Sequence, residues 1–189
     1  TAGYSIEQTI LPTGRDYRVF DDTLIYGLNK GVMTQHARPR YALGMRPEIK
    51  DYYWFTFVRN PWDRMVSAYC YLRPMHDKKH GSFEGWIGHI EKTQRLKGFP
   101  EGSHYLSQVS YLDDDRPMDF VGRFENIKSD WKIVCNKLGI ESTELKKENQ
   151  SRLREKRDYR EFYDNTTKEI ISSMYREDID RFGYQFEGK

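Results

Sequence analysis

The sequence predicts an α/β domain in which a short parallel sheet is flanked by helices. The main observation is an aromatic and β-branched run of strand length at residues 53–58, interrupted only by the polar Thr56. Such a run is typical of a parallel strand that is covered on both faces. A helix signal follows it at once. The chain has 189 residues, 14 Tyr, 10 Phe and 4 Trp, and no Pro/Gly/Ser-rich linker, so we expect one domain over residues 1–189.

The helix signal after this strand begins at Asn60. Asn is a favoured N-cap, Pro61 occupies a position where its missing N–H costs nothing, and Asp63 can face back toward the cap. The apolar side chains that follow at helical spacing mark the packed face of the helix: Trp62, Met65, Val66, Tyr69 and Cys70.

Two polar residues around this helix start suggest an anion site. Arg59 follows the carboxyl end of the strand, where ligands bind in open α/β sheets. Ser67 lies one turn after Asp63 and Arg64, so the three share a side of the helix. A guanidinium and a hydroxyl that converge beside a helix N-terminus can hold a phosphate. The structural alternative is that Arg59 pairs with a carboxylate and that Ser67 is a small helix-packing residue.

The sequence of residues 58–69 is Val-Arg-Asn-Pro-Trp-Asp-Arg-Met-Val-Ser-Ala-Tyr, and it is similar to a known motif. It resembles the 3′-phosphate-binding motif of sulfotransferases that use 3′-phosphoadenosine 5′-phosphosulfate (PAPS). It is especially similar to the carbohydrate-type branch, sulfotransferase family 2, and its bacterial relatives. The resemblance implies that Arg59 and Ser67 bind the 3′-phosphate. It also implies a P-loop NTPase-like fold of three layers.

The first residues of the chain resemble the tail of the family's 5′-phosphosulfate loop. Small residues in such a loop let backbone N–H groups approach the phosphate. In the family a strand and a lysine precede this tail, and the lysine stabilises the leaving group. We therefore expect a truncated form of a longer gene product, without its first strand and part of the loop; the alternative is that a lysine elsewhere takes this role. The residues implied to bind the cosubstrate here are Thr1, Ala2, Gly3, Tyr4 and Ser5.

Residues 118–126 resemble a strand-and-turn motif of the same branch. Within it, Arg123 and Glu125 form either a structural ion pair or part of the active site. A helix is predicted next, ended by Gly139. Its packed face is predicted to hold Ile127, Trp131, Val134, Cys135 and Leu138.

The last part of the chain, at residues 159–164 and 178–186, resembles the closing pattern of the family. Thr166 and Glu169 predict a capping box at the start of a final helix, which we expect to be scaffold. Its packed stripe is predicted to hold Ile170, Ile171, Met174, Tyr175 and Phe182.

Seven Lys or Arg residues stand against three acids in residues 146–160. One interpretation is a solvated basic loop. The other is a flap that closes over the phosphates of the nucleotide or receives an anionic acceptor. Relatives use a C-terminal loop in this way, often with an Asn-x-Ser sequence, which residues 149–151 match. The resemblance therefore implies cosubstrate contacts from Ser151 and Arg152.

A general base must accept the proton of the attacking hydroxyl. His36 is the first candidate, because carbohydrate-type relatives often carry a histidine near the acceptor at this point of the chain. A histidine pKa near about 6.5 suits proton transfer at neutral pH. The alternatives are an ordinary surface role for His36 and a catalytic role for His104. Residues 73–100 are where we expect acceptor selectivity.

The expected activity is transfer of a sulfuryl group from PAPS to an acceptor hydroxyl, with a saccharide as acceptor and 3′,5′-adenosine bisphosphate (PAP) as product. The family generally needs no metal. The alternative is a degenerate domain that binds nucleotide or sugar without turnover. A nucleotide kinase is disfavoured, because the sequence Gly-x-x-x-x-Gly-Lys-[Ser/Thr] is absent.

Composition excludes several other classes of protein. A formal charge of +2 is too small to indicate a nucleic-acid partner. No Cys/His cluster has metal-ligand spacing, and no apolar run is long enough to cross a membrane. Cys70 and Cys135 are expected to be reduced, buried thiols. The compartment stays open: the cytoplasm for a bacterial protein, or the Golgi lumen for a truncated eukaryotic relative.

Overall fold

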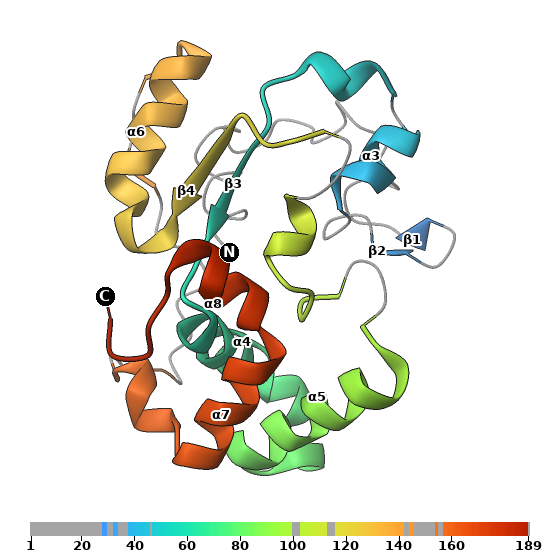
Figure 1. Ribbon diagram of the computed structural model, residues 1–189, viewed down its shortest axis with the longest axis vertical. Helices are drawn as coiled ribbons and strands as arrows, with labels where there is room; N and C mark the ends of the chain where they lie inside the picture. Colours follow the sequence, from blue (N-terminus) through green and yellow to red (C-terminus); the bar gives the residue numbers. More distant parts are fainter. Residues whose placement is uncertain are drawn as a thin grey trace. The chain divides into compact units, whose positions relative to one another are not determined.

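The structure is a computed structural model (Figure 1). It divides into two compact units: Thr1–Val58 with Pro100–Glu148, and Arg59–Phe99 with Asn149–Lys189. The described residues are 28–29, 32–33, 38–45, 47–99, 103–112, 116–141, 144–145, 154 and 157–188.

The first unit contains a two-stranded parallel sheet. Strand β3 (Phe55–Val58) pairs with β4 (Phe120–Arg123), with Phe55 opposite Phe120 and Val58 opposite Arg123. Figure 1 shows the two arrows side by side. The strand predicted at residues 53–58 and its parallel pairing are thereby confirmed, with the strand starting two residues later than expected.

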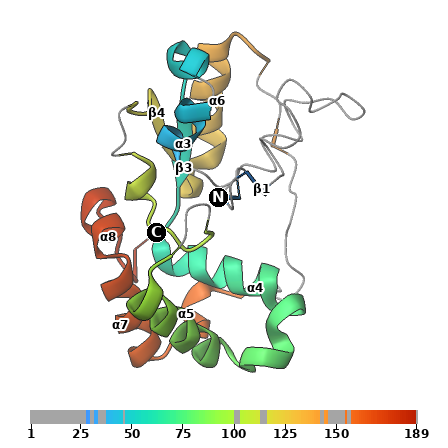
Figure 2. The ribbon, with the colours of Figure 1, turned by 90° about the vertical axis from the view of Figure 1, so that its right-hand side faces the viewer.

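Helix α6 (Ile127–Leu138) packs along this sheet (Figure 2). Its buried side chains Trp131, Val134 and Cys135 form a core with Phe57, and Gly139 ends the helix in the left-handed conformation as predicted. Leu138 is 39% exposed, so its predicted place on the packed face is wrong. A four-residue strand is about 13 Å long and a twelve-residue helix about 18 Å. The last turn of α6 therefore extends beyond the sheet.

The sheet is closely packed at Gly122. A Cβ atom added there would lie 2.5 Å from Cε1 of Phe57, a separation that real side chains essentially never show. The rings of Phe57 and Phe120 meet edge to face beside it. Glycine at this position is therefore a requirement of the aromatic core.

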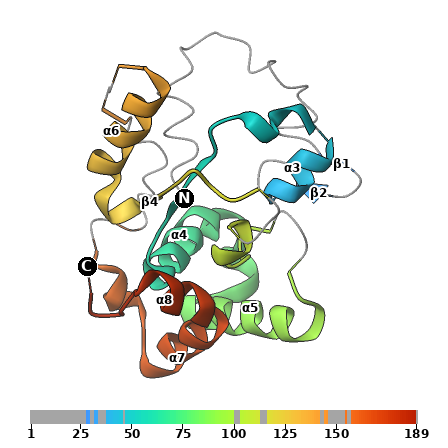
Figure 3. The ribbon, with the colours of Figure 1, turned by 45° about the horizontal axis from the view of Figure 1, so that its top comes forward.

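Short elements complete the first unit (Figure 3). Strands β1 and β2 pair antiparallel, and α3 is followed by the short 3-10 helix η2, against which it packs. The bounds are Leu28–Asn29 (β1), Val32–Met33 (β2), Pro39–Met45 (α3), Pro47–Asp51 (η2), Val109–Tyr111 (η3) and Phe124–Asn126 (η4).

The second unit is helical. Helix α7 packs against both α4 and α5, and α8 packs against α7 (Figure 3). The predicted packed face of α4 is confirmed, because its five apolar members are all buried. Ile171 and Tyr175 are buried as well. The bounds are Pro61–His80 (α4), Phe83–Lys97 (α5), Tyr159–Phe162 (η6, a 3-10 helix), Asn165–Met174 (α7) and Arg176–Phe182 (α8).

Helix α7 begins earlier than the sequence predicted. The Asp164 carboxylate accepts the N–H of Thr167 at 2.7 Å, and the Thr167 hydroxyl accepts the N–H of Asp164 at 3.1 Å. The capping box expected from Thr166 and Glu169 is therefore wrong. Asp is as good an N-cap as Thr or better, and burial of Thr167 fixes the pair. The predicted final helix is also broken into α7 and α8 at Tyr175.

Candidate functional site

The start of α4 is fixed by the side chain of Asn60, as predicted. Its Oδ1 accepts the backbone N–H groups of Trp62 at 3.0 Å and of Asp63 at 3.3 Å. The residue is only 3% exposed. Its Nδ2 donates to the carbonyl of Gln185 at 3.1 Å and contacts the Tyr159 hydroxyl at 3.5 Å. Asn60 thus caps the helix and ties it to the end of the chain.

Arg59 lies directly before this cap and is buried. Its Nε donates to Oδ2 of Asp63 at 2.6 Å, a short, charge-assisted hydrogen bond across one turn. The carboxylate pairing that the sequence left open is therefore present. It fixes the plane of the guanidinium beside the first turn of α4, where the N-terminal N–H groups and the helix dipole favour an anion.

The other oxygen of the same carboxylate faces a second arginine. Nη2 of Arg154 lies 2.6 Å from Oδ1 of Asp63, an ion-pair distance, with the Arg154 side chain 27% exposed. Among the described residues no donor meets hydrogen-bond geometry at this buried Oδ1. The contact of Arg154 with Asp63 therefore depends on charge and not on an aligned N–H, while its Nε donates to the carbonyl of Arg157 at 3.4 Å. Asp63 stands between two guanidiniums.

Arg154 was missed by the sequence reasoning. Its signal was the basic segment at residues 146–160, from which Ser151 and Arg152 were preferred because of the Asn-x-Ser wording. Nothing local distinguishes one arginine of that segment from another. Only the ion pair with Asp63 on α4 distinguishes Arg154.

Ser67 stands on α4 four residues after Asp63, and its side chain is half-buried. Positions four apart share one face of a helix. The structure thus places Ser67 on the face of α4 from which Asp63 holds Arg59.

The end of the chain packs against the beginning of α4 through Phe186. Its ring meets the rings of Trp62, Tyr159 and Tyr163 edge to face, and Nζ of Lys168 lies 4.3 Å from its centroid. The Tyr159 hydroxyl donates to the Phe186 carbonyl. Residues near both ends of the second unit therefore build one wall around the helix start.

Two tyrosines in this wall are neutral hydrogen-bond donors at neutral pH. Burial raises the pKa of the Tyr163 hydroxyl well above its usual value, and it also raises the pKa of Tyr159. The Tyr163 hydroxyl donates to the carbonyl of Trp62 at 2.9 Å. Both groups therefore hold the helix start in place and are unsuited to act as a general base.

Most of the other predicted site residues lie outside the described residues, so their predictions stay open. His104 is described and is exposed, next to Tyr105, whose hydroxyl pKa is raised by burial. Arg123 ends β4, and its N–H donates to the Asp130 carboxylate at 2.6 Å. The residues outside the described ranges are Thr1, Ala2, Gly3, Tyr4, Ser5, His36, Ser151 and Arg152.

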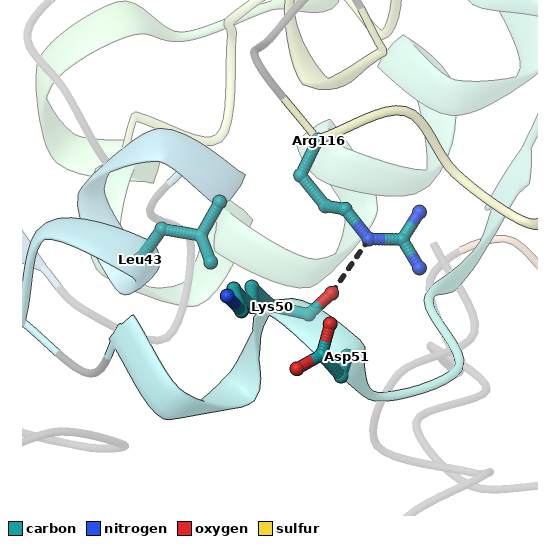
Figure 4. Close-up of a pocket in the computed structure, with 4 residues that line it drawn as sticks. All are labelled: Leu43, Lys50, Asp51 and Arg116. Carbon is teal, nitrogen blue, oxygen red and sulfur yellow. Dashed lines mark hydrogen bonds between the residues drawn. The ribbon is translucent and has the colours of Figure 1, made fainter.

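The first unit has an open pocket of about 550 Å³, lined by Leu43, Lys50, Asp51 and Arg116 (Figure 4). The Arg116 guanidinium donates to the carbonyls of Lys50, Tyr52 and Pro117. It also donates to the Asp119 carboxylate at 2.6 Å. These bonds join backbone segments, so Arg116 has a structural role at this pocket.

Neither a metal centre nor a membrane span is found in the described part of the chain. No group of three or more His, Cys, Asp or Glu residues within it is arranged to hold a metal ion. No helix within the same residues has the length and apolar character needed to cross a bilayer. Cys70 and Cys135 are buried, as the sequence predicted.

Comparison with known proteins gives one family and one relative. The model of the family described as "Sulfotransferase family" matches residues 27–185. A protein of Archaeoglobus fulgidus, described as an uncharacterized protein, is 29% identical over 86 residues. The aligned part covers 46% of this chain and 67% of the relative. No solved structure matches the chain.

Proposed function

The chain belongs to the sulfotransferase family, and from this membership we propose that it transfers a sulfuryl group from PAPS to an acceptor hydroxyl. The helix-rich structure with a short parallel sheet is compatible with an α/β sulfotransferase fold. The full fold that we propose is the three-layer, P-loop-like arrangement in which strand ends face the cosubstrate.

The buried guanidinium of Arg59 carries this proposal. It follows β3, is oriented by Asp63, and lies beside the capped N-terminus of α4. An anion placed there gains charge-assisted hydrogen bonds and a favourable helix dipole. We assign the 3′-phosphate of the cosubstrate to Arg59 and Ser67, the residues of the 58–69 motif suited to hold it.

The reaction is an in-line displacement at sulfur. The acceptor oxygen forms a bond to sulfur, the bond from sulfur to the bridging oxygen breaks, and PAP leaves with that electron pair. The acceptor proton goes to a base, for which we propose His36. Positioning and neutralisation of charge on the leaving oxygen supply the catalysis, as in phosphoryl transfer, and no metal is required.

The remaining assignments follow the family resemblance. The loop Thr1-Ala2-Gly3-Tyr4-Ser5 is proposed to receive the 5′-phosphosulfate, with Ser151 and Arg152 closing over the phosphates. A saccharide hydroxyl is the proposed acceptor, because the wording of residues 58–69 is that of the carbohydrate-type branch.

Calorimetric titration with PAP, and with adenosine 5′-phosphate as the control ligand, tests the proposal. We expect PAP to bind more tightly, because only PAP carries the 3′-phosphate. Arg59→Ala should weaken PAP binding by about 1.5–3 kcal/mol, or about 10- to 150-fold, and leave adenosine 5′-phosphate almost unchanged.

Arg160→Ala is the matched control, because Arg160 lies in the same unit but pairs with Asp158 on the surface. Equal binding of the two nucleotides by the wild-type chain would reject the 3′-phosphate site. Selective binding of PAP without sulfuryl transfer to any saccharide would favour a domain that binds without turnover.

A further inference from the structure

The structure assigns a positioning role to Asp63: we propose that its carboxylate assembles a two-arginine phosphate site from Arg59 and Arg154. The proposal rests on the function proposed above and goes beyond it, because it adds a second cation and the group that places it. The ligand is a phosphate monoester dianion, the 3′-phosphate of PAP or PAPS.

The first step is that Asp63 contacts the two arginines in different ways. Arg59 is bound through an aligned hydrogen bond from Nε to Oδ2, so the plane of its guanidinium is fixed. Arg154 lies at the same distance from Oδ1 but without hydrogen-bond alignment, so its N–H groups are not directed at the carboxylate. The Arg154 Nε donates only a long hydrogen bond, at 3.4 Å, to the carbonyl of Arg157. Its Nη groups are therefore the donors that can turn to a phosphate oxygen while the ion pair with Asp63 keeps the side chain in place.

The second step is the balance of charge. Two guanidiniums around one carboxylate leave this cluster with one net positive charge, so a dianion is still attracted. The Asp63 side chain is 14% exposed and that of Arg59 9%, which strengthens electrostatic interactions relative to those in open water. A lone carboxylate at this place would repel a phosphate. Between two arginines it is compensated.

The third step is the packing of the residues that follow Arg154. Tyr159 and Tyr163 contact the start of α4 at two further points. The Tyr159 hydroxyl lies 3.5 Å from Nδ2 of Asn60, and the Tyr163 hydroxyl donates to the carbonyl of Trp62. Arg154, Tyr159 and Tyr163 therefore each contact the first turn of α4 or its cap, beside Arg59.

Four variants separate this role from a merely structural one. Asp63→Asn keeps an oxygen that can accept from Arg59 but removes the charge that holds Arg154. We therefore expect Asp63→Asn, Arg154→Ala and the double variant to weaken PAP binding by a similar factor of about five. Asp63→Ala releases both arginines and should weaken binding by more than about tenfold.

The readout that a structural role would not move is selectivity between nucleotides. Adenosine 5′-phosphate should bind each variant within about twofold of wild type, because it lacks the 3′-phosphate. Asp119→Asn is the matched control, since it also removes the carboxylate of an Asp–Arg pair, one that lies in the first unit and has no part in the proposed site. It should leave both affinities unchanged.

Three results would overturn the proposal. Tighter PAP binding by Asp63→Asn would mean that the carboxylate competes with the phosphate. Additive losses in the double variant would mean that Arg154 does not act through Asp63. Unchanged selectivity in Arg154→Ala would remove Arg154 from the site. This variant keeps the Arg59–Asp63 pair, so it is informative even if the Asp63 variants fail to fold. If wild type itself does not prefer PAP, the proposed function fails and this proposal falls with it.

Discussion

The two units each contain a network of arginine and aspartate, and the comparison shows what distinguishes a structural arginine from a candidate ligand-binding one. In the first unit, Arg116 donates to three backbone carbonyls and to Asp119. The Asp119 carboxylate in turn accepts the N–H of Trp54 at 2.8 Å. One guanidinium and one carboxylate are thus used to join two stretches of backbone, residues 50–54 and 116–119.

In the second unit, the Asp63 carboxylate is shared by two guanidiniums, those of Arg59 and Arg154. This network has a net positive charge and stands at the N-terminus of a long helix, which favours anions. Two cations around one carboxylate at a helix N-terminus therefore indicate an anion site in the second unit. In the first unit, one cation and one carboxylate bind backbone groups, so the Arg116–Asp119 network is structural; we call it the brace. The four predictions below test this contrast.

The largest expected effect on stability is at Asn60, which caps the helix that carries Asp63. Asn60→Ala removes the helix cap and leaves the Gln185 carbonyl without its donor, so we expect the free energy of unfolding to fall by about 2–4 kcal/mol. Urea denaturation followed by circular dichroism measures it. Asn60→Asp keeps the cap but loses the donor and should cost less. A loss as large as that of Asn60→Ala would show that the bond to Gln185 dominates.

The second effect tests whether the core of the first unit can be weakened alone. Gly122→Ala forces a Cβ against the Phe57 ring and should lower the free energy of unfolding by about 1–3 kcal/mol. Gly88→Ala is the matched control in α5, where a Cβ meets nothing within 4 Å, and it should stabilise by about 0.5–1 kcal/mol. Equal melting behaviour of the two variants would contradict the close packing at Gly122.

The third prediction compares the loss of one arginine from each network. Arg116→Ala should lower the free energy of unfolding by about 1–2 kcal/mol, because three carbonyls lose a donor, and should leave PAP affinity unchanged. Arg154→Ala should do the reverse. Thermal melting and calorimetry on both variants provide the measurement. Weaker PAP binding by Arg116→Ala would end the distinction between brace and anion site.

The smallest effect is the pH dependence of the brace. The hydrogen bond from the Trp54 N–H, and then the Arg116 guanidinium, hold the pKa of Asp119 below its ordinary value. Because the folded pKa is the lower one, its stabilisation is present above pH about 4 and is lost as the pH falls through the folded pKa. Asp119→Asn should therefore make the free energy of unfolding depend less on pH below about pH 4 than it does in wild type. Asp180→Asn, which removes an exposed carboxylate, is the charge control.

Local signals in the sequence predicted the parts of the fold that depend on neighbours in the chain. Asn60 and Pro61 marked the start of α4, and Gly139 marked the end of α6. The aromatic run before Arg59 predicted β3 and its parallel pairing. The helix signals succeed because capping acts within a few residues, and the strand signal succeeds because an apolar run of this length is typical of a buried parallel strand. The prediction of the α7 cap was wrong because Asp164 and Thr166 are both good N-cap residues. Burial of Thr167, which pairs with Asp164, decided between them.

The sequence by itself therefore determined the strand, the helix start and the family to which the 58–69 motif points. The tertiary structure decided which partners these elements meet: Asn60 is bound to Gln185, 125 positions away, and Asp63 is paired with Arg154 out of a segment rich in equivalent cations. Propensities and caps are properties of adjacent residues, whereas ion pairs between distant segments follow from how the packed faces of α4 and its neighbours fit together.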